Sequence, residues 1–63
     1  MASYDNCKTG DVMSLPGGYG FNILSDRNRP LVTLEFSTRD EAKQARDEIA
    51  KAVAKAVTIT PHS

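Results

Sequence analysis

The sequence predicts a small α+β domain, in which an antiparallel β-hairpin or a three-stranded meander packs against one C-terminal amphipathic helix. Two observations support this fold class. Two apolar runs of period 2 flank a polar segment that contains proline, which is typical of a hairpin. A helix-capping pair then precedes a stretch whose apolar residues recur at helical spacing. We expect strands over about residues 11–15, 19–24 and 31–36 and a helix over about 39–56.

The first expected strand is short and ends at a turn. Residues 11–15 precede Pro16, Gly17 and Gly18, which stop regular structure. Phosphate-binding loops are also rich in glycine, but they lead from a strand into a helix. The glycines here lead into a strand instead, so a flexible turn is the favoured interpretation. Gly20 is expected to mark a bulge or a close approach of two backbones.

The register of the hairpin follows from its large side chains. Pairing Leu24 with Leu31 places all six on one face, whereas a slip of one residue scatters them between the two faces. Asn28 in the connecting loop tolerates the left-handed conformation, and Pro30 can begin the return strand. The side chains expected to share the core face are Tyr19, Phe21, Ile23, Val32, Leu34 and Phe36.

The helix has a clear start and an apolar stripe. Thr38 and Glu41 form a capping box, and Asp47 has lysines four residues away on either side, at positions 43 and 51. After residue 56 the chain changes to β-branched residues, and we favour an extended segment at a sheet edge over a fraying helix. The residues of the stripe are Ala42, Ala45, Ile49, Ala52, Val53 and Ala56.

The length of 63 residues allows one domain with a small core. Domains of this size usually gain stability from disulfides, a metal or a partner chain. The single cysteine, Cys7, excludes an internal disulfide, and the single histidine, His62, disfavours a zinc site. We therefore expect a homodimer, with a ββα or βββα monomer as the alternative. Residues 1–10 are expected to form an irregular lead-in, 11–57 the domain and 58–63 a tail.

Charge and hydropathy disfavour several classes of function. Eight basic and eight acidic side chains give no net charge, so the chain lacks the overall positive charge of general nucleic-acid or anionic-membrane binders. No apolar run approaches the roughly 20 residues of a membrane span. The first residues lack the basic start and apolar run of a signal peptide, and we expect a cytoplasmic location.

Catalytic chemistry has little support in the sequence. Cys7 is the one plausible nucleophile by type, and its sole imidazole partner, His62, lies at the opposite end of the chain. The carboxylates of the expected helix all have capping or ion-pair explanations, whereas acid–base catalysis needs a sheltered carboxylate. We expect no enzymatic activity and no cofactor.

Two candidate contact sites lie at the hairpin tip. Leu24 and Leu31 are expected on the outer side of the sheet, where an opposed apolar pair can begin a protein contact. Arg27, Arg29 and Arg39 form the alternative, a site for nucleic-acid phosphates. The favoured function is a small protein-interaction or assembly module without catalytic activity. The alternative is a weak nucleic-acid-binding module that uses the arginines of the tip.

Part of the chain resembles a known arrangement. The run from Tyr19 to Ala42, with the helix that follows to about residue 56, is similar to the closing hairpin and helix of pleckstrin-homology-type domains. Those domains have several earlier strands and usually a tryptophan in the final helix, and this chain shows neither. The resemblance therefore implies only a shared strand–strand–helix arrangement, and no phosphoinositide-binding role passes to any residue.

Overall fold

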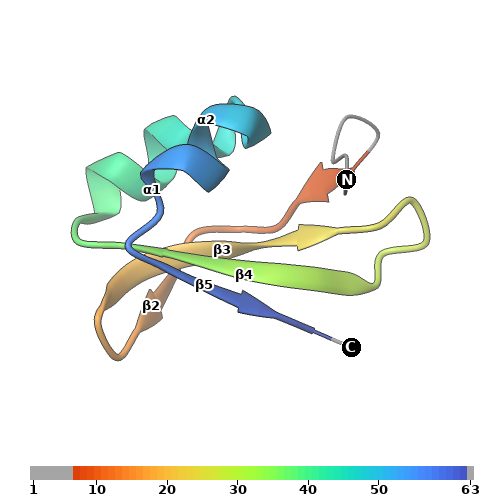
Figure 1. Ribbon diagram of the computed structural model, residues 1–63, viewed down its shortest axis with the longest axis horizontal. Coiled ribbons are helices and arrows are strands. Elements are labelled where there is room, and N and C mark those ends of the chain that lie inside the picture. The colour runs from red at the N-terminus through yellow and green to blue at the C-terminus, as the bar shows by residue number, and fades with distance from the viewer. Residues whose placement is uncertain (1–6, 63) are drawn as a thin grey trace.

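The computed structural model describes residues 7–62, which form one antiparallel sheet with two helices on one of its sides (Figure 1). This arrangement confirms the α+β class, but the sheet has five strands instead of two or three. The elements in chain order are β1 (Lys8–Thr9), β2 (Met13–Leu15), β3 (Gly18–Leu24), β4 (Pro30–Phe36), α1 (Arg39–Arg46), α2 (Ile49–Lys55) and β5 (Thr58–Pro61).

The hairpin β3–β4 forms the centre of the sheet. β1 and β2 both pair with the free side of β3, and β5 pairs with the free side of β4. The tail is therefore extended and adds to the sheet, as expected. The lead-in expected over residues 1–10 lies outside the described residues as far as residue 6, and its part at Lys8–Thr9 is a strand. The helices lie between β4 and β5 in the chain.

The register of the hairpin is confirmed over most of its length. Tyr19 pairs with Phe36 and Phe21 pairs with Leu34, as the alternation of large side chains requires. A glycine is needed where β2 turns into β3, since Gly18 has a φ of 152°. A Cβ atom at Gly18 would also overlap the carbonyl oxygen of Phe36.

The predicted pairing of Leu24 with Leu31 is wrong, because Leu24 pairs with Pro30. The connecting loop is tighter than expected. The Ser25 N–H donates to the Arg29 carbonyl at 2.8 Å, and Asn28 adopts the left-handed conformation with a φ of 62°. The pairing of Ile23 with Val32 and of Leu24 with Pro30 leaves Leu31 as an extra residue in β4. The register of the hairpin therefore shifts by one residue at a bulge next to the turn.

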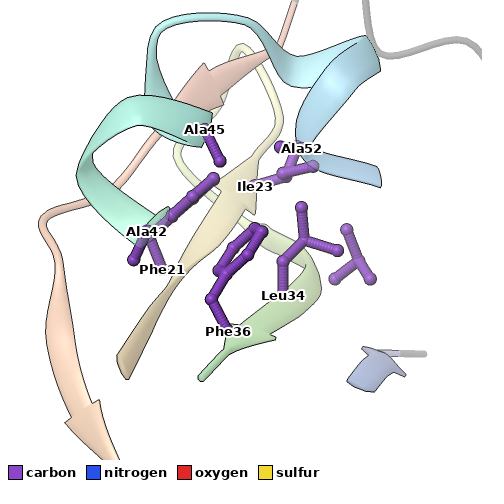
Figure 2. Close-up of a cluster of buried hydrophobic side chains, with 8 residues drawn as sticks. Phe21, Ile23, Leu34, Phe36, Ala42, Ala45 and Ala52 are labelled. Carbon is purple, nitrogen blue, oxygen red and sulfur yellow. The ribbon is translucent and has the colours of Figure 1, made fainter. Parts of the chain in front are cut away.

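The core lies between the inner face of the sheet, which is the face toward the helices, and three alanines of those helices (Figure 2). Five of the six predicted side chains are buried there, while Tyr19 at the end of β3 remains 38% exposed. Small alanines allow the helices to lie close to the bulky side chains of the strands. The buried residues are Phe21, Ile23, Val32, Leu34, Phe36, Ala42, Ala45 and Ala52.

The single helix predicted over 39–56 is wrong, because the helix breaks after Arg46. Asp47 closes α1 and Glu48 has an extended backbone with φ −135° and ψ 102°. A straight helix of that length would measure about 27 Å against about 20 Å for the strands, so its end would extend past the sheet. The break turns α2 back over β4, where Ala52 is fully buried.

The predicted N-cap at Thr38 is confirmed, and the Glu41 carboxylate accepts a hydrogen bond from the Thr38 hydroxyl at 3.2 Å instead of from its backbone N–H. The Thr38 hydroxyl accepts a hydrogen bond from the Glu41 N–H at 3.2 Å. The predicted ion pairs of Asp47 with Lys43 and Lys51 are not formed within the described part of the chain. The extended backbone of Glu48 takes Lys51 out of helical spacing with Asp47. Lys51 instead pairs with Glu48, the N-cap residue of α2, at 3.3 Å.

Candidate functional site

The outer face of the sheet, which points away from α1 and α2, has no other element of the described chain over it (Figure 1). Side chains on a strand alternate between its two faces, so the buried core residues identify their neighbours as outer-face residues. Antiparallel sheets commonly have one such solvated face. This face is therefore open to contact with another molecule.

Polar side chains on three neighbouring strands form a chain of hydrogen bonds in the middle of the outer face. The Thr33 hydroxyl of β4 donates to Asn22 Oδ1 of β3 at 2.6 Å. The same hydroxyl lies 2.6 Å from His62 Nε2, just after β5. Because that hydroxyl hydrogen is used by Asn22, the short contact requires His62 to donate from Nε2. These bonds hold β3, β4 and the end of β5 together on the solvent side.

A mixed row of residues crosses the sheet at the end nearest the hairpin tip. Lys8 on β1 pairs with Leu24 on β3, and the His62 N–H donates to the Leu31 carbonyl of β4 at 2.9 Å. With strands about 4.8 Å apart, this row is about 14 Å wide. We refer to Lys8, Leu24, Leu31 and His62 as the tip row.

The two leucines of the tip row do not belong to the core. Both are half-buried, and neither packs against the buried cluster on the inner face. Their sequence-predicted placement near each other on the outer side agrees with the strand alternation, although Leu24 faces Pro30 in the ladder.

Two arginines extend from the ordered loop beside the tip row. The Ser25 hydroxyl accepts hydrogen bonds from the N–H groups of Arg27 and Arg29, both at 3.2 Å. Both arginine side chains are exposed, as is Asp26. The loop backbone is thus held in one shape while its charged side chains reach into solvent.

Arg39 does not join the other two arginines. It begins α1 just after β4, whereas Arg27 and Arg29 precede β4, so the length of that strand, about 20 Å, separates them. The tip loop and the start of α1 lie at opposite ends of the molecule (Figure 1). Of the aromatic side chains that could stack on nucleic-acid bases, Phe21 is buried on the inner face, and Tyr19, which is 38% exposed, pairs with Phe36 at the end of the hairpin away from the tip loop.

The edges of the sheet are poorly suited to pairing with another strand. On β5, the backbone N–H and C=O groups of Thr58 and Thr60 point toward β4, so those of Ile59 and Pro61 lie on the free edge of the sheet. Pro61 has no N–H to offer on this edge. The N–H of Val57, the residue before β5, already donates to the Glu35 carbonyl at 2.8 Å. Only the Ile59 N–H remains on that edge between residues 57 and 61. The opposite edge is interrupted between β1 and β2.

Other features weighed in the sequence have local explanations. Cys7 and His62 flank β1 and β5, the two outermost strands, and Cys7 packs against the core while His62 lies on the outer face. The two side chains therefore do not meet. The turn at Pro16 and Gly17 leads into β3, and the Gly17 N–H donates to the Glu35 carboxylate at 2.7 Å. The Gly17 N–H is thus already bound to a carboxylate of the chain itself and is not free to bind a phosphate.

The helix break creates one open cavity of about 320 Å³ beside the end of β4. Phe36 and Ala45 form part of its wall, and exposed side chains of both charges surround it. Within residues 7–62, no cluster of side chains has the composition of a metal site. The remaining residues that line the cavity are Glu41, Gln44, Asp47, Glu48, Lys51 and Lys55.

Comparison of the chain with models of known protein families, with curated proteins and with solved structures finds no match. Neither helix of the described residues is long and apolar enough to span a membrane. The sequence identified Leu24, Leu31, Arg27 and Arg29 as candidates, but not Lys8 or His62. Both of these belong to short edge segments whose pairing no local pattern reveals.

Proposed function

We propose that the protein is a small interaction or assembly module without catalytic activity, and that it binds a partner protein through the tip row. The observation that supports this most directly is the position of Leu24 and Leu31. Two half-buried leucines outside the core lie on the uncovered side of the sheet, beside an ordered loop. Apolar groups surrounded by polar and charged ones are the usual composition of a protein-binding surface.

The edges of the sheet offer few free hydrogen-bond donors, which favours its outer face as the binding surface. Because Pro61 and Val57 leave one outward N–H on β5, an added strand would gain few backbone hydrogen bonds there. The alternative of a weak nucleic-acid binder is less favoured. Arg39 lies far from Arg27 and Arg29, and the exposed Tyr19 lies at the end of the hairpin away from the tip loop.

A matched pair of variants tests the proposal. Leu24→Ser with Leu31→Ser removes the apolar part of the tip row, and Val57→Ser with Ile59→Ser removes two exposed apolar side chains elsewhere. The immobilised wild-type protein and both variants are compared for the proteins that they retain from a cell extract. Amide spectra show whether each variant keeps the fold. The proposal predicts proteins that the wild type and the Val57/Ile59 variant retain and the leucine variant loses.

The same retained proteins on all three forms would refute the role of the leucines. Self-association, which the small size of the chain led us to expect, is a separate prediction. Sedimentation of the wild type over a dilution series tests it directly. A monomer at every concentration would exclude the homodimer.

A further inference from the structure

We infer that the partner of the tip row is an acidic protein segment that also presents apolar side chains. This inference rests on the proposed function, because it names the chemistry of the partner at the same surface. The tip row supplies the apolar contact through Leu24 and Leu31. The charged side chains around the leucines specify that the partner is acidic, although the formal net charge of the whole chain is zero.

Positive charge is concentrated at this end of the molecule. Lys8 lies across from Leu24, and Arg27 and Arg29 extend from the loop that follows it. All three cations are exposed, and among residues 7–62 Asp26 is the one carboxylate beside them. The tip therefore has an excess of two positive charges in a chain whose formal net charge is zero. Such a local excess attracts and orients an oppositely charged partner.

The cations near the tip have no intramolecular partner within the described residues. The ion pairs of this part of the chain join Arg46 to Asp11 at 3.9 Å and Lys51 to Glu48 at 3.3 Å, both away from the tip. An arginine can bind a carboxylate through two parallel hydrogen bonds. Carboxylates of a bound segment would thus meet Arg27, Arg29 and Lys8 while its apolar side chains lie on the leucines.

Two other anionic partners fit the surface less well. Recognition of single-stranded nucleic acid relies on aromatic stacking platforms, and none of the outer-face residues of β2, β3, β4 and β5 is aromatic. Insertion into a membrane requires apolar side chains that protrude. The loop of residues 26–29 has none, and Leu24 and Leu31 are half-buried in the sheet.

The test uses the full chain and a short fluorescein-labelled peptide of alternating glutamate and leucine. Its twin has glutamine in place of every glutamate. The charge variant is Arg27→Glu with Arg29→Glu, and its control is Lys43→Glu with Lys55→Glu, which changes the net charge equally on the helices. Fluorescence anisotropy measures affinity, and amide chemical shifts locate the bound peptide. An amide spectrum of each variant without peptide confirms its fold.

The glutamate peptide is expected to shift the amides of Lys8, of residues 24–31 and of His62. An exposed ion pair contributes up to about fivefold in affinity. Reversal of both arginines removes two such pairs and adds repulsion, so binding should weaken at least about tenfold, while the lysine control stays within about twofold. Affinity should also fall as salt rises from about 0.1 M to about 1 M, where the screening length decreases from about 10 Å to about 3 Å. Leu24→Ser with Leu31→Ser should weaken binding as well.

Equal binding of the glutamine peptide, unchanged affinity of the arginine variant or shifts confined to the helices would overturn the inference. The inference would also be overturned if the glutamate peptide does not bind, whether or not oligouridylate or vesicles of phosphatidylserine and phosphatidylcholine bind the same tip. If the glutamate peptide does not bind but the leucine variant still loses proteins that the wild type retains, the partner is not acidic and the proposed interaction function stands. If neither effect occurs, both proposals fail.

Discussion

Two leucines of the same strand provide a direct test of which face of the sheet is the core. Leu34 and Leu31 are both in β4, but Leu34 is fully buried on the inner face and Leu31 is half-buried on the outer face. Replacing a fully buried leucine by alanine costs about 2 to 5 kcal/mol. A domain of 63 residues has a stability of about 3 to 9 kcal/mol. Leu34→Ala should therefore remove a large part of the free energy of unfolding.

Leu31→Ala should cost about 1 kcal/mol or less, because surface substitutions outside the core have small effects. Urea unfolding followed by circular dichroism at 222 nm measures both variants, at low and at high protein concentration. Equal losses in the two variants would show that the inner and outer faces are wrongly assigned. If the wild type becomes more stable at high protein concentration and Leu31→Ala abolishes that gain, a second copy covers the outer face.

Three further substitutions test local features, each by thermal or urea unfolding. Thr38→Ala removes the hydroxyl that caps α1 and should cost about 1 kcal/mol, and no loss would mean that the cap contributes nothing in solution. Glu48→Asp places a good capping residue where the side chain makes no capping bond, so α2 should gain about 0.5 to 1 kcal/mol. A decrease would contradict the helix boundary at that residue. Gly18→Ala should cost more than about 1 kcal/mol, because its φ of 152° and the nearby Phe36 carbonyl leave no space for Cβ. Wild-type stability in that variant would refute the turn geometry.

The central hairpin was predictable because its pattern is redundant. Six large side chains alternate over two runs, and only one register places them on the same face. The N-terminal cap of the helix was predictable for a similar reason, since threonine is a favoured capping residue and Thr38 directly precedes the apolar stripe of the helix. In both cases the information lies within a few residues of the feature that it determines.

The helix break and the bulge were not predictable from local patterns. Residues 39–56 contain neither glycine nor proline, and their apolar spacing fits one continuous helix. The break at Asp47 and Glu48 arises because a short sheet cannot cover a long helix, so burial of Ala52 outweighs helix propensity. The bulge at Leu31 depends on the tight turn chosen by the loop, which the strand pattern does not specify.

The candidate surface was visible in the sequence only in part. Leu24 and Leu31 follow from the alternation of the hairpin, and Arg27 and Arg29 from their place in its loop. Lys8 lies in a strand of two residues, which is too short to give a periodic signal. Its position beside Leu24 is a tertiary fact, as is the distance that separates Arg39 from the tip.

Pro61 has a consequence for the behaviour of the chain in concentrated solution. The residues before it, Val57 to Thr60, alternate between exposed aliphatic and threonine side chains, all of them β-branched. Short uncharged segments of this composition stack readily into amyloid fibrils when their backbone donors are free. The proline ends the segment at the border of the sheet and acts as a gatekeeper against fibril growth. A change to valine at that one position would lengthen the segment and remove the safeguard, although no contact in the core would be lost.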